Sequence, residues 1–327
     1  MSFAFPQKFA FIVGAPRSGT TSLSTYLGEH PDMCFSNVKE PHFFSQHDLT
    51  ALPEDELREF VEAEYLARYF PHCPDRGSML AEGSVTYLYA ARRMEPILRL
   101  WPDAKFVIAL RDPMAMLPSL HQRLLYLGDE TVTDFGKAWS LVPERLRGRK
   151  VPRSCIAPSW LNYEEIGRLG SNVERFFEVV GRERCFVSVY DDLVADPAAQ
   201  YRRLLDFLGL PDDQRKDFAA RRTSQGYRIG WLQRLMKRPP KATRAILAGE
   251  KFRQRVKPLE GTKARDPVIA KAILAGRKRL LRWNKAPAPP IHLTGELRRD
   301  VRETLNDDIA RLSRLIGRDL GHWLRAD

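Results

Sequence analysis

Residues 9–29, FAFIVGAPRSGTTSLSTYLGE, decide the fold class of this chain. The apolar residues 9–13 have the length and composition of a buried strand, and residues 18–27 predict a helix that ends at His30-Pro31. Residues 14–21, here named the glycine loop, join the two. A loop that leads from a strand into a helix directs backbone N–H groups at one spot and, together with the helix dipole, favours an anion.

The spacing of the glycine loop is that of a Walker phosphate-binding loop, G-x-x-x-x-G-K-[ST], with one change. Gly14 and Gly19 have the Walker spacing and Thr21 stands at the Ser/Thr position, but Thr20 replaces the lysine, and the nearest cation is Arg17. Nucleoside triphosphatases use that lysine on the outer phosphates. The loop therefore predicts an anion site that is poorly equipped for ATP; the alternative is a tight turn that contains two glycines.

The stretch GAPRSGTTSL resembles the 5′-phosphosulfate loop of sulfotransferases, which use 3′-phosphoadenosine-5′-phosphosulfate (PAPS). The resemblance implies an α/β fold of P-loop-like type, with a central parallel sheet flanked by helices. It also implies PAPS as the sulfuryl donor, PAP as the product and no metal. The donor-binding residues would be Pro16, Arg17, Ser18, Gly19, Thr20, Thr21 and Ser22, with Arg17 also stabilising charge on the leaving group.

Residues 39–44, KEPHFF, supply a candidate general base. Pro41 confines the backbone at Glu40 to an extended form, and the two phenylalanines anchor the segment. A carboxylate fixed in this way near the glycine loop is a candidate base. The segment is similar to the catalytic segment of heparan-sulfate-type sulfotransferases, in which the glutamate deprotonates the acceptor. His42 is the rival base, although a packed or hydrogen-bonded core role is favoured for it; Lys39 faces either the cofactor or solvent.

Residues 82–87, EGSVTY, resemble the E-K-S-P-x-Y segment of the same family. Gly83 stands where the heparan-sulfate group carries a lysine near the acceptor, and this departure weakens the expectation of a heparan-like substrate. Glu82 is a candidate for acceptor binding or for a second acid/base, but a hydrogen-bonded strut is the favoured interpretation.

The next apolar strand, residues 105–110, ends in Arg111-Asp112-Pro113, and a helix is expected from 115 to 127. In the family, this R-D-P…S spacing binds the 3′-phosphate of PAPS, which here implies Arg111 and Ser119; a guanidinium supplies charge and several donors. Two alternatives are a local Arg111–Asp112 ion pair and a Walker B role in which Asp112 holds magnesium. The preceding arginine would repel a metal ion, so the 3′-phosphate role is favoured.

Further strands and helices are expected along the rest of the chain. Residues 33–36 predict a short strand, and residues 79–87 predict a strand followed by a loop. Residues 54–70 and 160–180 predict helices. Residues 185–208, VSVYDDLVADP included, are similar to the family's fourth strand and helix, with a mainly structural role. Helices at 264–283 and 294–316 enclose a linker at 286–290, and the closing IGRDLGHWL resembles the C-terminus of many bacterial sulfotransferases.

Positive charge is concentrated near the C-terminus. Residues 221–286 hold 20 Lys/Arg against 3 Asp/Glu, a balance of +17, which leaves −5 for the rest of a chain of net charge +12. Such a patch suits an anionic cofactor, an acidic glycan, nucleic acid or a membrane surface, or it is a set of solvated helix faces. It lacks the aromatic-interleaved pattern of an RNA-binding sheet. The family resemblance places the last cofactor loop here, with Gly226 and Arg228 as candidates.

Composition is ordinary for a soluble globular protein of 327 residues, with 43% hydrophobic and 29% charged residues. We expect one domain over residues 1–327, with residues 221–290 a basic helical lid or insertion within it. The four cysteines, Cys34, Cys73, Cys155 and Cys185, form no C-x-x-C pair, so a reduced, cytoplasmic setting is expected. No apolar run approaches the roughly 20 residues of a membrane helix, and the start of the chain lacks a signal peptide's features.

These observations together predict transfer of a sulfuryl group from PAPS to a hydroxyl, or an amine, of a carbohydrate, lipid or small-molecule acceptor, with Glu40 as the base. One rival function is a P-loop kinase of a small metabolite, which would depend on ATP and magnesium. The other is a non-catalytic binder of acidic glycan or nucleic acid, which would bind through the basic patch with steep salt dependence.

Overall fold

The computed structural model describes residues 8–73, 79–219, 225–238, 267–288, 291 and 293–324. The chain divides into two compact units. Unit 1 comprises Met1–Met116, Gly167–Arg222 and Val301–Asp327, and unit 2 comprises Leu117–Ile166 and Thr223–Asp300. Each unit is described by itself, and the expectation of a single domain stays a prediction.

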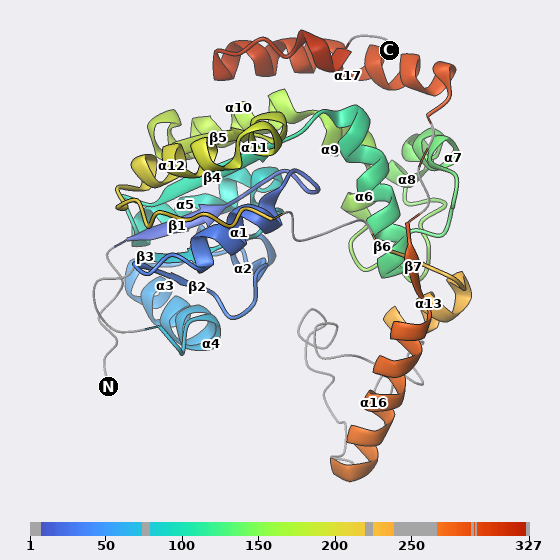
Figure 1. Cartoon of the computed structure of the whole chain (residues 1–327), viewed down its shortest axis with the longest axis horizontal. Helices are drawn as coiled ribbons and strands as arrows, with labels where there is room; N and C mark the ends of the chain where they lie inside the picture. Colours follow the sequence, from blue (N-terminus) through green and yellow to red (C-terminus); the bar gives the residue numbers. More distant parts are fainter. Residues whose placement is uncertain are drawn as a thin grey trace. The chain divides into compact units, whose positions relative to one another are not determined.

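Unit 1 is built on a parallel five-stranded sheet in the order β2-β3-β1-β4-β5 (Figure 1). Its strands are β1 (Phe9–Ile12), β2 (Met33–Phe35), β3 (Met79–Glu82), β4 (Lys105–Leu110) and β5 (Cys185–Val189). Strand β1 is central and pairs with β3 on one side, where Phe9 is opposite Leu80, and with β4 on the other, where Ala10 is opposite Lys105. The α/β fold with a central parallel sheet is therefore confirmed.

Alternation along β1 gives the sheet two different faces, because successive side chains of a strand point to opposite sides. One face is aliphatic: Ala10 and Ile12 are fully buried in a cluster with Leu23 of α1 and Leu204 of α12. The other face is aromatic. On it Phe9 contacts the ring of Trp101 at a centroid distance of 4.7 Å and Phe11 that of Phe106 at 5.6 Å. Both faces are covered, as parallel sheets require.

The helices of unit 1 include predicted ones with different bounds and short ones that the sequence did not predict. They are α1 (Thr20–Gly28), α2 (Phe43–Gln46), α3 (Glu54–Val61), α4 (Ala67–Tyr69), α5 (Glu95–Leu100), α10 (Leu169–Val180), α11 (Tyr190–Ala195) and α12 (Pro197–Leu208). The expected helix at 54–70 is interrupted by a π-helical turn at Glu62–Leu66 between α3 and α4. Helices α6 (Pro113–Leu127), α9 (Tyr163–Gly167) and α17 (Gly295–Ile316) contain residues of both units.

The expected single helix at 160–180 is wrong. A 3₁₀ turn at Pro158–Leu161 and the short α9 precede α10. The helical conformation is interrupted at Arg168, whose ψ is 65°. The carboxylate of Asp308, on α17, accepts hydrogen bonds from the backbone N–H groups of Gly170 (2.6 Å) and Ser171 (2.9 Å). These are donors that the first turn of a helix leaves unsatisfied. Asp308, from a distant segment, thus caps the start of α10 as a separate helix. The local sequence does not reveal this cap.

Unit 2 contains α7 (Phe135–Ser140), α8 (Val142–Leu146), α13 (Gly230–Lys237) and α16 (Pro267–Trp283), and an antiparallel pair of strands, β6 (Gln225–Tyr227) and β7 (Lys285–Pro287). The expected linker at 286–290 therefore begins as a strand, which is a correction. The expected basic helix is present as α16.

Charged side chains are buried in pairs inside unit 2. Arg145 and Glu130, both almost fully buried, form an ion pair at 2.8 Å. Burial raises the pKa of Glu130, but hydrogen bonds, which include one from Arg145, outweigh it and leave the pKa below its ordinary value. Arg238 pairs with Asp129 at 2.6 Å. Because a buried charge without its partner is costly, both pairs fix how the segments of unit 2 pack.

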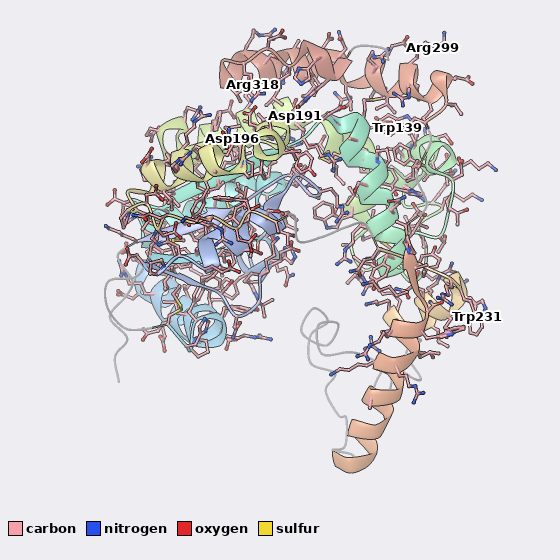
Figure 2. The ribbon with its side chains drawn as sticks, viewed as in Figure 1. Trp139, Asp191, Asp196, Trp231, Arg299 and Arg318 are labelled. Atoms are coloured by element: carbon pink, nitrogen blue, oxygen red, sulfur yellow. A yellow bond between two sulfur atoms is a disulfide. The ribbon has the colours of Figure 1, made fainter. Side chains whose placement is uncertain are left out.

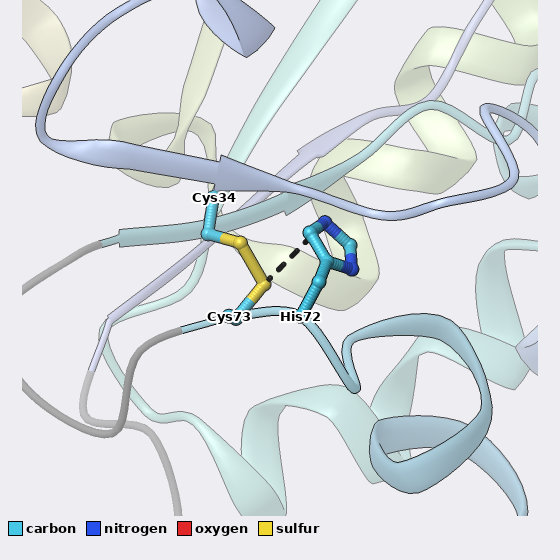
Figure 3. A group of neighbouring side chains, drawn as sticks. All are labelled: Cys34, His72 and Cys73. Carbon is cyan, nitrogen blue, oxygen red and sulfur yellow. Dashed lines mark hydrogen bonds between the residues drawn. A yellow bond between two sulfur atoms is a disulfide. The ribbon is translucent and has the colours of Figure 1, made fainter.

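A disulfide joins Cys34 of β2 to Cys73 in the loop after α4 (Figure 3). The expectation that the cysteines are all reduced is therefore wrong for this pair, whose Cα atoms lie 5.7 Å apart although 39 residues separate them in sequence. Disulfides persist in oxidising compartments and are rare in the cytosol, so the bond counts against the expected reduced setting. Nearby, His72 Nε2 lies 3.1 Å from the carbonyl oxygen of Phe35, so the same loop holds the end of β2 twice.

The C-terminal segment is pinned to the start of α11 (Figure 2). Arg318 forms two hydrogen bonds with Asp192, and Trp323 Nε1 donates to Asp191 at 3.0 Å. The closing residues therefore anchor the C-terminal segment to the segment that follows β5. Within the described residues, no helix combines the length and apolar character needed to cross a bilayer.

Gly170 tests the contact between α10 and α17. A Cβ at this position would lie 2.2 Å from the backbone oxygen of Asp308. We expect Gly170→Ala to lower the free energy of unfolding by about 1–3 kcal/mol through overpacking, measured by denaturant unfolding. Gly276→Ala is the matched control: that helical glycine has no atom within 4 Å of an added Cβ, so alanine's higher helix propensity should make it neutral or stabilising. Equal effects of the two variants would contradict this packing.

Candidate functional site

The candidate site lies at the carboxyl ends of the strands of unit 1. The chain leaves β1 into the glycine loop, while the neighbours of β1 are β3 on one side and β4 on the other. Connections that diverge to opposite sides of a strand leave a crevice at its carboxyl end, where ligands of open α/β sheets bind. Strands β2, β3, β4 and β5 are parallel to β1, so the segments that follow them begin at the same edge of the sheet.

Gly19 sets the shape of the glycine loop. Its φ of 83° is in the left-handed region that favours glycine. An added Cβ would lie 2.7 Å from Leu193 Cδ2 and 3.2 Å from Tyr190 Cδ2. This left-handed residue precedes α1, so the helix begins at Thr20, two residues later than predicted. Arg17 also has a positive φ, 64°; strained residues of this kind cluster at functional sites.

Arg111 is held beside the glycine loop. Its Nη1 donates to the carbonyl oxygen of Arg17 at 3.1 Å, and its guanidinium carbon lies 4.4 Å from the ring centroid of Tyr190. This hydrogen bond uses one of the five N–H donors of a guanidinium. The structure therefore places the Arg111 side chain, which the sequence assigned to the 3′-phosphate end of the donor, against the backbone of Arg17, which it assigned to the other end.

Sequence reasoning missed Tyr190. It treated the segment after β5 as mainly structural, yet this ring supports Arg111 and borders Gly19. A tyrosine directly after a strand is a weak signal, because aromatic residues in strands usually serve the core. What could have drawn attention to it is its place at the carboxyl end of a fifth parallel strand.

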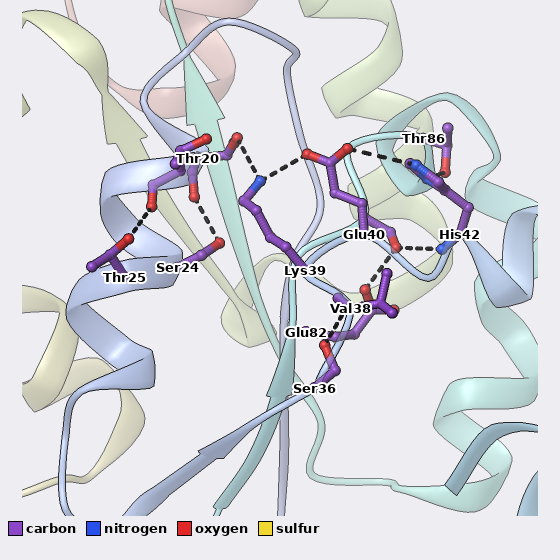
Figure 4. A network of polar contacts seen from close by, with 12 residues as sticks. Thr20, Ser24, Thr25, Ser36, Val38, Lys39, Glu40, His42, Glu82 and Thr86 are labelled. Carbon is purple, nitrogen blue, oxygen red and sulfur yellow. Dashed lines mark hydrogen bonds and ion pairs between the residues drawn. The ribbon is translucent and has the colours of Figure 1, made fainter. Parts of the chain in front are cut away.

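The segment after β2 carries a chain of polar contacts (Figure 4). Glu40 has a side chain 32% exposed, so a ligand can reach it. Its Oε1 accepts a hydrogen bond from Lys39 Nζ at 2.8 Å, and its Oε2 lies 3.6 Å from His42 Nε2. Lys39 Nζ also donates to Thr20 Oγ1 of the glycine loop, at 3.4 Å. The candidate base and the glycine loop are thus joined through one lysine.

His42 is buried and held from two sides. Its Nδ1 lies 2.9 Å from Thr86 Oγ1, and its backbone N–H donates to Ser84 Oγ at 2.8 Å. Its φ is 58°, an uncommon conformation for a residue with a side chain. The imidazole thereby presents Nε2 to Glu40, an arrangement that suits a residue orienting the carboxylate.

Glu82 is fully buried at the end of β3. Its carboxylate accepts hydrogen bonds from Ser84 Oγ (2.6 Å) and from the hydroxyl of Tyr65 (3.3 Å). Burial raises the pKa of Glu82 to about 7, against the lowering effect of these bonds. A carboxyl group that solvent cannot reach favours the strut over a role in contacting the acceptor. Its partner Ser84 in turn holds the backbone of His42, so the strut supports the Glu40 segment.

Asp112 caps α6. Its Oδ1 accepts from the backbone N–H of Met114 at 2.8 Å. Burial, with a further contribution from Asp191, raises the pKa of Asp112 to about 6, although that hydrogen bond and Arg111 lower it. Helix capping accounts for this carboxylate, and a group that is hard to ionise is a poor magnesium ligand.

The other predicted donor contacts belong to unit 2. Ser119 lies half-buried in α6. Gly226 is buried in β6, where a Cβ would lie 2.7 Å from the carbonyl oxygen of Pro287, so close strand pairing explains this glycine. Arg228 is exposed, with its guanidinium 5.9 Å from the ring centroid of Trp283. Residues 220–224 and 239–266, with Thr223, Ser224 and much of the basic segment, lie outside the described residues.

The residues of unit 1 gather groups that can bind an anion at one edge of the sheet. A glycine-containing turn into the nine-residue α1, an Arg111 side chain on the Arg17 carbonyl, and a reachable carboxylate joined to the turn through Lys39 all lie at this edge. The sequence profile of the Sulfotransferase family matches residues 10–79 and 63–214, which is more than half of the chain. The chain belongs to the sulfotransferase family. The match reaches all five strands of the central sheet and covers the residues of the site just described in unit 1.

Individual relatives of this sulfotransferase are distant. Over 208 residues it is 26% identical to heparan sulfate glucosamine 3-O-sulfotransferase 3A1 of Mus musculus, covering 62% of this chain and 45% of that one. Over 221 residues it is 24% identical to protein-tyrosine sulfotransferase A of Caenorhabditis elegans, covering 63% and 51%. The chain spans about half the length of these curated relatives.

A solved structure shares the fold over the whole length of this sulfotransferase. The sulfotransferase from Alicyclobacillus acidocaldarius superposes with a TM-score of 0.64 at 24% identity, covering 98% of this chain and 100% of that one. The P-loop-like sulfotransferase fold is thereby confirmed.

Glu82 makes a prediction about stability and pH. Its pKa is raised on folding from 4.5 to about 7, so its contribution to stability is complete below pH 4.5 and is lost as the pH rises through 7. Glu82→Gln is neutral at every pH and lacks this loss. Relative to the parent, the variant should gain up to about 3 kcal/mol of unfolding free energy between about pH 5 and pH 8, because each pKa unit corresponds to about 1.4 kcal/mol. Denaturant unfolding across that range measures it; parallel profiles for the two proteins would contradict the burial.

Proposed function

We propose that this chain transfers a sulfuryl group from PAPS to a hydroxyl, or an amine, of an acceptor, with Glu40 as the general base. The observation that carries the proposal is the contact of a reachable Glu40 carboxylate, through Lys39, with Thr20 of the glycine loop. A general base must lie close to the proton that it removes. A carboxylate beside the anion site is therefore placed to deprotonate an acceptor that attacks the bound anionic group. The family supports this assignment, since its relatives are sulfotransferases by name.

The donor would be held by residues at both of its anionic ends. Arg17 and the backbone N–H groups of residues 18–22, Pro16 preceding them, would bind the 5′-phosphosulfate. Arg111, with Ser119, would bind the 3′-phosphate, and Arg228 and Gly226 are proposed as further contacts. PAPS would supply the activated sulfuryl group. Since a sulfuryl carries less charge than a phosphoryl, arginines and amides suffice without a metal ion.

In the proposed reaction, the acceptor O–H gives its proton to the Glu40 carboxylate while its oxygen forms a bond to sulfur. The bond between sulfur and the phosphate oxygen breaks, and its electron pair stays with that oxygen, which gives PAP. His42 would keep the Glu40 carboxylate turned toward the acceptor, since its Nε2 lies 3.6 Å from Oε2. Arg17 would stabilise the negative charge that develops on the leaving side.

The acceptor is proposed as a carbohydrate, a lipid or a small molecule with a hydroxyl group. One relative is named for heparan sulfate and another for protein tyrosine, so the relatives do not agree on an acceptor class. In this chain Gly83 carries no side chain, and an added Cβ would lie 2.9 Å from Ser24 Oγ. That position therefore offers the acceptor no charged contact.

Arg111 tests the donor assignment. We expect PAP to raise the melting temperature more than 5′-AMP does, because the 3′-phosphate, which 5′-AMP lacks, would accept hydrogen bonds from Arg111. Arg111→Ala should remove most of that difference, since each charge-assisted hydrogen bond lost costs about 1.5–3 kcal/mol. Thermal unfolding with each nucleotide measures it. Equal stabilisation of the parent by both nucleotides would remove the 3′-phosphate assignment.

Transfer of labelled sulfate from PAPS to a panel of acceptors, without added metal, tests the function itself. Glu40→Gln should fold, bind PAP as the parent does and lose at least about a hundredfold in turnover, because general-base catalysis contributes that much or more. Glu59→Gln, a change of the same chemistry at an exposed position of α3, is the control and should keep full activity.

Three results would count against this proposal. Full activity of Glu40→Gln would move the role of base to His42. Activity with ATP and magnesium but not with PAPS would favour a kinase, and salt-sensitive glycan or nucleic-acid binding without any turnover would favour a binding protein.

A further inference from the structure

We infer that Lys39 is a further catalytic residue, beside Glu40 and Arg17, which contacts the transferring sulfuryl group and the oxygen that leaves it. The inference rests on the proposed function and goes beyond it. The structure assigns to Lys39 the place that a lysine of the glycine loop occupies in a Walker motif. In this chain that lysine is replaced by Thr20.

The geometry of Lys39 carries this assignment. Its Nζ donates to Thr20 Oγ1 at 3.4 Å, so an ammonium group reaches, from the segment after β2, the residue that replaces the Walker lysine (Figure 4). Thr20 is the first residue of α1, where backbone N–H groups and the helix dipole attract an anion. An anion bound at this helix start is therefore also beside the ammonium group.

The backbone of Lys39 is fixed, so its reach is defined. Its carbonyl oxygen accepts a hydrogen bond from the backbone N–H of Gly83 at 2.9 Å. Two residues earlier, the backbone N–H of Asn37 donates to the carbonyl of Tyr69 at 2.9 Å. The Cys34–Cys73 disulfide ties the same strand end to the loop after α4. Only the flexible side chain of Lys39 is left to adjust to a ligand.

Lys39 also pairs with the candidate base, and this gives it a part in the reaction. The Nζ to Glu40 Oε1 distance is 2.8 Å, and the two side chains are 24% and 32% exposed. Partly exposed ion pairs are weak, so a ligand can separate them. When Glu40 accepts the acceptor's proton it loses its charge and its hold on Lys39. The ammonium group is then drawn toward the negative charge that develops on the leaving oxygen.

This step balances without a proton from Lys39. The acceptor proton ends on Glu40, the new bond joins the acceptor oxygen to sulfur, and the electron pair of the broken sulfur–oxygen bond stays on the phosphate oxygen of PAP. Lys39 keeps its three protons and acts by charge and hydrogen bonding alone, in the way that preorganised donors stabilise a transition state.

The experiment compares Lys39→Met, Lys39→Arg and Lys8→Met in the full chain. Lys8 is exposed and lies at the opposite end of β1 from the glycine loop, so Lys8→Met removes the same charge elsewhere. Two measurements are made: turnover with PAPS, and the affinities for PAPS and for PAP, which lacks the sulfuryl group. We expect Lys39→Met to lose about 10²–10³ in turnover, the range for one lost electrostatic contact at a reacting oxygen.

The binding measurement separates contact with the sulfuryl group from a structural role. Lys39→Met should lose more affinity for PAPS than for PAP, because PAP keeps the leaving phosphate oxygen but lacks the sulfuryl group. Lys39→Arg should restore part of the losses in turnover and affinity, and Lys8→Met should behave as the parent. Full turnover in Lys39→Met, or equal losses of affinity for PAPS and for PAP, overturns the inference. If the parent itself transfers no sulfate, the proposed function fails. The dependence of the PAPS-over-PAP preference on Lys39 then still decides whether Lys39 contacts the sulfuryl group.

Discussion

The tight packing of the turn between β1 and α1 is the constraint on which the site of unit 1 depends. At its start, a Cβ on Gly14 would lie 2.6 Å from Leu88 Cδ2. At its end, Gly19 adopts a left-handed conformation with Leu193 and Tyr190 against it. Side chains on both sides thus hold the loop in a shape that only glycine permits at these two positions. The start of α1, and with it the anion site, follows from that shape.

A chain of polar contacts extends from this turn into the core. It runs from Thr20 through Lys39 and Glu40 to His42, and the backbone of His42 then leads through Ser84 to the buried Glu82. The exposed end can change partners, whereas the buried end is closed by hydrogen bonds. A satisfied buried network rigidifies its surroundings. Burial raises the pKa of Glu82 to about 7. Ionising this buried carboxyl group lowers the free energy of unfolding above that pH, which is the cost of the rigid network.

Anchors from distant parts of the chain hold the site's segments in place. The Cys34–Cys73 disulfide fixes the strand that leads to Glu40. The C-terminal residues bind Asp191 and Asp192, which follow Tyr190 in the sequence. Tyr190 in turn supports Arg111 against the glycine loop. Each of the two candidate cations and the candidate base therefore depends on contacts that lie far away in sequence.

The sequence by itself determined the parallel α/β fold, the glycine loop and the order of the segments at its edge, because strand periodicity, glycine spacing and turn residues are local properties. It also singled out Glu40 and Arg111 by motif. Only the tertiary structure decided where Lys39 points, that Tyr190 supports Arg111, that Cys34 bonds Cys73 and that Asp308 starts α10 afresh. These are contacts between residues 19 to 138 positions apart, and a linear pattern holds no record of which distant side chains meet.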